Sequence, residues 1–162
     1  MSSPYQVHVF KEYLKFSAAH FIAYQGFREP LHGHNYQVSV RVEGDLGGDG
    51  YVLDFGLVKK AAKRVCERLD EKVLLPANSD CLAISRVGGN VSVRYEDGST
   101  FSFPEGDVVM LPIVHSSAEE LACHLVTRLL EELPDLRNRG VRLIEVGVAE
   151  APGQVAYYRR EL

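Results

Sequence analysis

Alternating apolar and polar side chains predict β-strands in three parts of the chain, over residues 7–16, 32–44 and 141–149. A repeat of two residues is what a strand with one buried face requires. The second of these segments is rich in β-branched side chains and ends in a glycine-rich turn, which marks a strand end.

Two longer segments instead have an apolar side chain every three or four residues, which predicts amphipathic helices. The first covers about 57–69, and Asp54 is placed to cap its N-terminus. The second begins near Ser117, which forms a capping box with Glu120, and it ends before Pro134.

Between the two helices, the pattern predicts an antiparallel hairpin insertion at about 82–110. Its strands, 91–95 and 99–103, flank an Asp97-Gly98 turn signal. A chain of 162 residues suits one domain, 1–162, with a single core. Few helices, and strands joined by short turns, indicate the α+β fold class with an antiparallel sheet. Two helices cover such a sheet only in part, so we expect a homo-oligomer that closes its strand edges.

Composition excludes several classes of partner. The net charge is −4 and the basic residues are scattered, so we expect no nucleic acid as a partner. No apolar run reaches the roughly 20 residues that span a bilayer, and the N-terminus lacks the pattern of a signal peptide. The three cysteines lie far apart without a Cys-x-x-Cys pair, which argues against a disulfide framework and suits a cytoplasmic protein.

Three histidines are candidate metal ligands. His32 and His34 are one residue apart in a predicted strand, so their imidazoles project from the same face. His20 lies twelve positions before them, at the end of another strand-like run. Three neutral imidazoles and one open position are what a catalytic zinc ion needs. Hydrogen-bonded strand histidines are the alternative interpretation.

Six short motifs occur in order: Phe16-Ser17-Ala18-Ala19-His20, Leu31-His32-Gly33-His34-Asn35-Tyr36, Val52-Leu53-Asp54-Phe55, Leu69-Asp70, Ser116-Ser117-Ala118-Glu119 and Val148-Ala149-Glu150. Together they resemble the 6-pyruvoyltetrahydropterin synthase / 6-carboxytetrahydropterin synthase family over about residues 7–160. The resemblance implies a tunnelling fold (T-fold), in which an antiparallel sheet has two helices on one face. It also implies assembly through edge strands into a hexamer, a dimer of trimers.

The resemblance further implies Zn²⁺ bound by His20, His32 and His34. Its substrate would be a small-molecule pterin, 7,8-dihydroneopterin triphosphate, whose side-chain hydroxyls the metal binds. A carboxylate at Glu150 would accept hydrogen bonds from the ring N–H and the 2-amino group of the pterin, a bidentate match. Taken alone, Glu150 is also an ordinary acid at the end of a strand.

The chain departs from the family pattern where a cysteine is expected a few residues before His32. The loop 26–31 contains no cysteine, and Glu29 stands three residues before His32. This resembles a branch of the family in which glutamate replaces cysteine and the pterin side chain is cleaved to 6-hydroxymethyl-7,8-dihydropterin, a folate precursor. A carboxylate can serve as the general base. A surface-loop acid is the alternative interpretation of Glu29.

A second departure concerns the proton relay. The family pattern has a histidine after Leu-Asp, whereas here Asp70 is followed by Glu71. We expect His115 or Glu71 to replace that histidine in a relay with Asp70, although His115 could also be an ordinary loop residue. Ser116 and Ser117 are expected to contact the pterin.

These observations predict an enzyme, a zinc-dependent pterin lyase that cleaves the side chain of 7,8-dihydroneopterin triphosphate. Three alternatives stay open. One is 6-pyruvoyltetrahydropterin or 6-carboxytetrahydropterin synthase activity, which the missing cysteine disfavours. The second is a non-catalytic protein that binds zinc and a pterin, and the third is a purely structural domain without a metal. The sequence predicts no function for the insertion.

Overall fold

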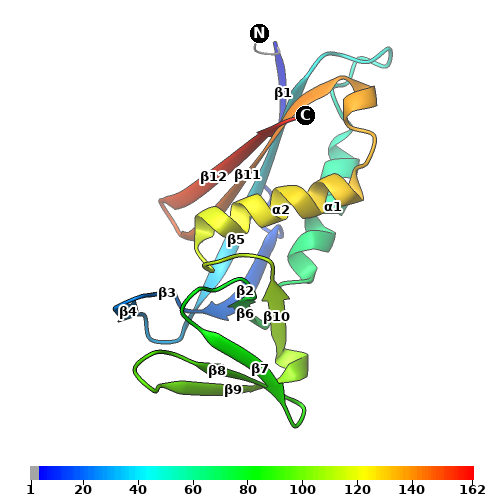
Figure 1. The fold of residues 1–162 in the computed structure, drawn as a ribbon. Coiled ribbons are helices and arrows are strands. Elements are labelled where there is room, and N and C mark those ends of the chain that lie inside the picture. The colour runs from blue at the N-terminus through cyan, green and yellow to red at the C-terminus, as the bar shows by residue number, and fades with distance from the viewer. Residues whose placement is uncertain (1–3) are drawn as a thin grey trace.

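The computed structural model of the chain describes residues 4–162 and has two helices packed on one face of a β-sheet (Figure 1). The strands of this sheet are β1 (Tyr5–Val9), β2 (Lys15–His20), β5 (His32–Gly44), β6 (Lys72–Pro76), β10 (Val108–Leu111), β11 (Val141–Ala151) and β12 (Gln154–Glu161). Their order is β10-β6-β2-β5-β11-β12, and β1 also pairs with β5. The predicted α+β fold class is confirmed.

Strand β5 organises the sheet because it pairs with β11 along one edge and with both β2 and β1 along the other. The predicted single strand over 7–16 is therefore wrong, since a turn separates β1 from β2. Val7 and Val9 are buried in β1, whereas Phe16 and Ala18 are buried in β2. The buried positions change from odd to even numbers, and an unbroken strand could not turn both sets toward the same core.

The sheet is mixed, which corrects the prediction of a wholly antiparallel sheet. Strand β6 is parallel to both β2 and β10, while β1, β2, β11 and β12 form antiparallel pairs. Long connections precede β6 and β10, as parallel pairing requires. Neither strand was predicted, because each is short and lacks alternation. Strand β12 was also missed, although Pro152 and Gly153, the latter at φ +80°, mark the turn before it.

The two helices agree with their predicted positions. Helix α1 (Phe55–Glu67) packs against β1, β2 and β5, and α2 (Ala118–Glu132) packs against β11 and β12. The main core lies between these helices and the sheet. Among the described residues, neither helix is long and apolar enough to cross a bilayer.

Both predicted N-terminal caps are present, but the capping box of α2 is closed differently. Asp54 accepts hydrogen bonds from the backbone of the first turn of α1. The Ser117 hydroxyl accepts a hydrogen bond from the Glu120 N–H at 3.3 Å. The Glu120 carboxylate does not return a bond to Ser117. It accepts bonds from the N–H groups of Val114 and His115, at 2.9 and 2.8 Å, and so fixes the loop before the helix.

The insertion is a three-stranded antiparallel meander rather than a two-stranded hairpin. It consists of β7 (Ala83–Val87), β8 (Asn90–Arg94) and β9 (Thr100–Pro104), with the predicted Asp97-Gly98 turn between the last two. A 3₁₀ turn (Glu105–Asp107) leads from it to β10, and a second one (Arg137–Arg139) precedes β11.

The meander lies below the end of the main sheet, next to a small hairpin of β3 (Ala23–Tyr24) and β4 (Phe27–Arg28) (Figure 1). This hairpin ends at Arg28, so Glu29 directly follows it. A second apolar core joins the meander to the chain around the hairpin, and its buried members are Phe21, Ala23, Leu75, Leu82, Val91, Val93 and Tyr95.

Candidate metal centre and active site

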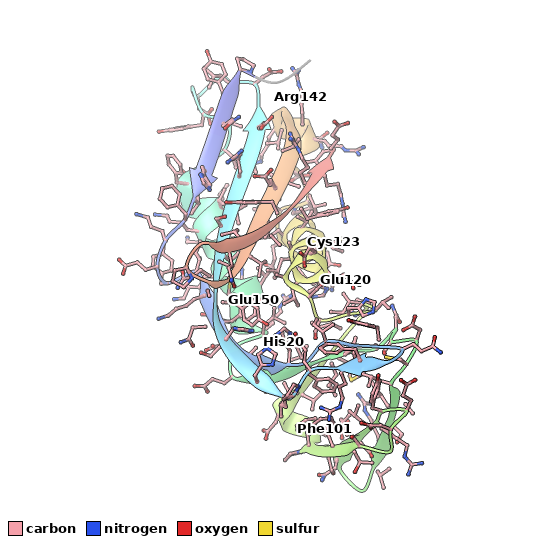
Figure 2. All side chains as sticks on the ribbon, turned by 90° about the vertical axis from the view of Figure 1, so that its left-hand side faces the viewer. His20, Phe101, Glu120, Cys123, Arg142 and Glu150 are labelled. Carbon is pink, nitrogen blue, oxygen red and sulfur yellow. The ribbon has the colours of Figure 1, made fainter. Side chains whose placement is uncertain are left out.

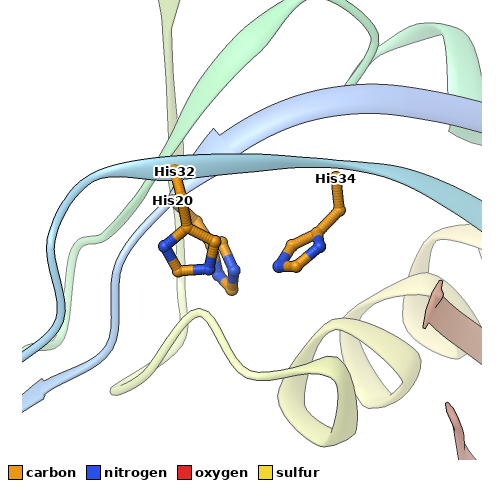
Figure 3. Close-up of side chains that lie close together, drawn as sticks. All are labelled: His20, His32 and His34. Atoms are coloured by element: carbon orange, nitrogen blue, oxygen red, sulfur yellow. The ribbon is translucent and has the colours of Figure 1, made fainter.

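The pairing of β2 with β5 brings the three histidines together. His20 is the cross-strand partner of His32, and His34 lies two residues further along β5 on the same face. The three rings converge from these two strands (Figure 3). One nitrogen from each ring lies within 4.8 Å of the nitrogens of the other two. The predicted cluster of three imidazoles is therefore present in the structure.

Backbone carbonyls orient two of the rings. The Nδ1 atom of His20 lies 2.7 Å from the Ser116 carbonyl oxygen, and Nδ1 of His32 lies 2.8 Å from that of Pro30. A carbonyl only accepts, so each Nδ1 carries a proton, and in the neutral form of each ring the lone pair is then on Nε2. Burial lowers the pKa of His20, outweighing the opposite effect of the Ser116 carbonyl. Neutral imidazoles with free Nε2 atoms are what a metal ion requires.

Several buried polar atoms beside the cluster have no hydrogen-bond partner among the described residues. They are Nε2 of His20, Nε2 of His34 and the phenolic oxygen of Tyr36. Buried polar atoms are almost always paired, because an unpaired one loses its hydration without compensation. A cation bound by the free nitrogens would remove this cost at both histidines. The residues present therefore fit a metal ion.

Glu150 faces the same cluster from β11 (Figure 2). Its two carboxylate oxygens lie 3.9 Å from Nε2 of His20 and 3.9 Å from Nε2 of His34. The pairing of β11 with β12 shifts register between Ala149 and Ala151, so the ladder is irregular at Glu150. Irregular pairing, as at β-bulges, is common beside active sites. The structure thus brings Glu150 to the histidines.

Glu29 is tied to the chain next to His20. Its Oε2 accepts a hydrogen bond from the Ile22 N–H at 2.8 Å, and its own N–H donates to the Ile22 carbonyl at 2.9 Å. Burial raises the pKa of the Tyr36 phenol, and the charges of Glu150 and Glu29 raise it further. The negative charges of both carboxylates therefore favour the protonated form of the Tyr36 hydroxyl beside the cluster.

Asp70 and Glu71 make no hydrogen bond or ion pair with the three histidines among the described residues. Asp70 accepts a hydrogen bond from the Ser17 N–H at 2.8 Å, and Glu71 has a left-handed backbone with φ 56°. Glu71 lines an open cavity of about 550 Å³, whose lining also includes Ser17, Asn35 and His34. This cavity therefore reaches the edge of the histidine cluster.

The loop before α2 holds the remaining predicted residues. Ser116 is fully buried, and its hydroxyl donates to the carbonyl of Phe21, the residue after His20, at 3.1 Å. This hydroxyl therefore ties the loop to β2 and does not face open space. Ser117 caps α2. The Nδ1 atom of His115 lies 3.1 Å from a Glu120 carboxylate oxygen.

Sequence reasoning missed two contributors to the site. Tyr36 follows His32 and His34 with the same alternation, so the pattern could have placed its ring on the same face. No sequence feature could have indicated the Ser116 carbonyl, because only the fold brings this backbone group to His20.

The sheet, the two helices on one face and the converging imidazoles define a class of protein, the T-fold proteins with a three-histidine centre suited to a metal ion. The chain belongs to the 6-pyruvoyl tetrahydropterin synthase family, whose model matches residues 9–161. It is a lyase that processes pterins.

Known relatives agree with this family. A Methanocaldococcus jannaschii protein that carries the name 6-carboxy-5,6,7,8-tetrahydropterin synthase is 35% identical over 150 residues, covering 92% of this chain and 91% of its own. The crystal structure of 6-pyruvoyl tetrahydropterin synthase from Plasmodium vivax has a TM-score of 0.95 and 45% identity, and the match covers 98% of both chains. Two further structures of that protein have a catalytic glutamate replaced by alanine or by cysteine. A Pyrococcus furiosus dihydroneopterin monophosphate aldolase is 41% identical over 59 residues, 36% of this chain and 50% of its own.

Proposed function

We propose that this lyase is zinc-dependent and cleaves the side chain of 7,8-dihydroneopterin triphosphate to give 6-hydroxymethyl-7,8-dihydropterin, a folate precursor. The observation that carries the proposal is the convergence of three imidazoles, together with Glu29, which is hydrogen-bonded to Ile22 two residues after His20. The product retains C1′, and the released two-carbon aldehyde retains the triphosphate.

His20, His32 and His34 would hold the zinc ion through their Nε2 atoms. Three histidine ligands and an open position are typical of catalytic zinc. When bound, the ion would polarise the side-chain hydroxyls of the substrate and favour their deprotonation. The carbonyls of Ser116 and Pro30 keep His20 and His32 in the required tautomer.

Glu29 would act as general base. It removes the proton of the C2′ hydroxyl, the C1′–C2′ bond breaks, and its electron pair moves into the pterin ring while C2′ becomes the aldehyde carbon. A proton then returns to C1′ and completes the hydroxymethyl group. One Glu29 oxygen already accepts the Ile22 N–H, which fixes the carboxylate and leaves the second oxygen for the substrate.

Glu150 would bind the pterin through its ring N–H and 2-amino group, and Ser117 would lie at the edge of that pocket. Asp70 and Glu71 make no hydrogen bond or ion pair with the three histidines among the described residues, so a relay through them would serve the histidines of a second copy of the chain. The protein would then be a homo-oligomer, a hexamer built from two trimers, in which His115 is the relay residue available within the same chain. The free cysteines fit a cytoplasmic enzyme.

Two relatives support cleavage over the alternatives. The Pyrococcus furiosus protein is an aldolase acting on a phosphorylated dihydroneopterin. The Plasmodium vivax enzyme has a catalytic glutamate, in line with Glu29 as base. The name of the Methanocaldococcus jannaschii relative favours instead 6-carboxytetrahydropterin formation, the second candidate function.

Incubation of the zinc-loaded protein with 7,8-dihydroneopterin triphosphate, followed by chromatography of the pterins, tests the proposal. We expect 6-hydroxymethyl-7,8-dihydropterin as the main product. A main product of 6-pyruvoyl- or 6-carboxytetrahydropterin would overturn it, and an unchanged substrate would indicate a non-catalytic binding protein.

A further inference from the structure

The hairpin that carries Glu29 is too small to hold its shape alone. Strands β3 and β4 share only two residue pairs, Ala23 with Arg28 and Tyr24 with Phe27. A short two-stranded hairpin is at best marginally stable in water. The position of Glu29 relative to the histidines must therefore come from what the hairpin packs against.

The turn between β8 and β9 of the meander binds the backbone of this hairpin. The Glu96 carboxylate accepts a hydrogen bond from the Gly26 N–H at 2.7 Å. Gly26 is the turn residue of the hairpin and has φ +90°. The Tyr95 hydroxyl donates to the Tyr24 carbonyl at 2.8 Å and lies 3.0 Å from the same Glu96 carboxylate. Two adjacent meander residues thus bind the tip of the hairpin.

Arg28 links the meander directly to Glu29. Its guanidinium lies over the Phe101 ring of β9, 5.2 Å from the ring centre, and its Nη2 lies 3.5 Å from the Ser99 hydroxyl. From this position Nη1 donates to the Glu29 carbonyl at 2.9 Å. The meander therefore orients the backbone of the residue that we propose as base.

Apolar packing continues this contact to the metal centre. Phe101 stacks on Phe21 with ring centres 4.8 Å apart, and Phe21 is the residue after His20. Phe21 and Ala23 belong to the same buried cluster as Val93 and Tyr95 of the meander. Figure 2 shows Phe101 in the meander, at the end of the molecule below His20.

We propose that the β7–β9 meander is a positioning element for catalysis, which holds the Glu29 carboxylate at the three-histidine centre through Tyr95, Glu96 and Phe101. The inference rests on the proposed role of Glu29 as base. It gives the insertion a defined role, in which it contacts neither metal nor substrate. Loosening these contacts lowers kcat, because a small displacement of a catalytic group is costly, but it leaves zinc binding unchanged.

The test uses the full-length, zinc-loaded Tyr95→Phe/Glu96→Ala variant. The two substitutions remove the hydroxyl that bonds the Tyr24 carbonyl and the carboxylate that accepts the Gly26 N–H. We expect kcat for 7,8-dihydroneopterin triphosphate to fall about tenfold, with KM and the zinc content unchanged. Amide hydrogen exchange in residues 22–29 should become faster. Ser102→Ala is the matched control, because it removes a hydroxyl of the same meander that bonds Asn90 and not the hairpin.

A combination with Glu29→Gln separates positioning from a general loss of structure. In the Glu29→Gln background, the double substitution should lower turnover no further, because the group that it positions is absent. Full activity of Glu29→Gln would refute Glu29 as base and with it the proposed function. If Glu29→Gln is inactive but the meander variant keeps the parent kcat and the parent exchange rates, the positioning role alone is wrong.

Discussion

The Nδ1 atom of His20 lies 2.7 Å from the carbonyl oxygen of Ser116, so the loop before α2 sets the tautomer of a histidine on β2. Glu120 fixes this loop by accepting the N–H groups of Val114 and His115. Figure 2 shows Glu120 at the start of α2, on the same side of the molecule as His20. Glu120 is therefore an outer partner of the metal centre.

Glu120→Ala should weaken zinc binding about 10- to 100-fold, the usual effect of removing an outer partner of a metal ligand. Competition with a chelator at constant pH measures this change. Glu119→Ala is the matched control, since Glu119 is exposed and its loss removes the same charge from the first turn of α2. Equal zinc affinity in the two variants would contradict the prediction.

His34→Ala should remove the zinc ion, which we expect at one per chain, and with it the turnover of 7,8-dihydroneopterin triphosphate. Two imidazoles hold a catalytic zinc ion far less tightly than three. Metal analysis after gel filtration and circular dichroism give the zinc content and the fold. His8→Ala, outside the cluster, should retain both, and a zinc-loaded His34→Ala would show that the cluster is not the metal site.

Glu29→Gln should lower kcat about 10²- to 10⁴-fold, the usual contribution of a general base, with the zinc content unchanged. Glutamine keeps an acceptor for the Ile22 N–H, so the hairpin should stay in place. Single-turnover kinetics measure the loss, and Glu105→Gln, in an exposed ion pair with Arg86, is the control. A kcat within twofold of the parent would mean that another group takes the proton.

Glu150→Gln distinguishes a pterin-binding residue from a metal ligand. An amide presents only one acceptor to the two N–H donors of the pterin, so KM should rise about tenfold or more while zinc stays bound. Substrate titration and metal analysis on the same sample give both quantities. Loss of zinc with an unchanged KM would assign Glu150 to the metal instead, a role that its 3.9 Å distances from His20 and His34 make worth testing.

His124, on α2, should make the fold sensitive to acid. Burial lowers its pKa below 6.5, and the charge of Arg128 lowers it further, against the opposite effect of Glu131. The unfolded chain therefore takes up this proton at a higher pH than the folded protein does, so the free energy of unfolding falls as the pH drops below about 6.5. Thermal unfolding from pH 7.5 to 5 should show a smaller decline in Tm for His124→Gln. Identical declines would show that other groups govern the acid response.

Elements that depend on neighbours along the chain could be predicted from the amino-acid sequence alone. Asp54 and Ser117 could be placed at helix starts because a cap bonds to backbone groups two or three residues away. Likewise, His32 and His34 share a face because alternation is a property of one strand. The family motifs extended this local information to His20 and Glu150.

The way in which distant segments meet could be known only from the three-dimensional fold. The pairing of β2 with β5 placed His20 opposite His32. The break between β1 and β2 allows the apolar side chains of both strands to be buried in the same core. No sequence pattern indicates that the Ser116 carbonyl contacts His20 or that Arg28 lies over the Phe101 ring. Such contacts depend on which strands pair and in what register, and that choice is made by the burial of the whole core.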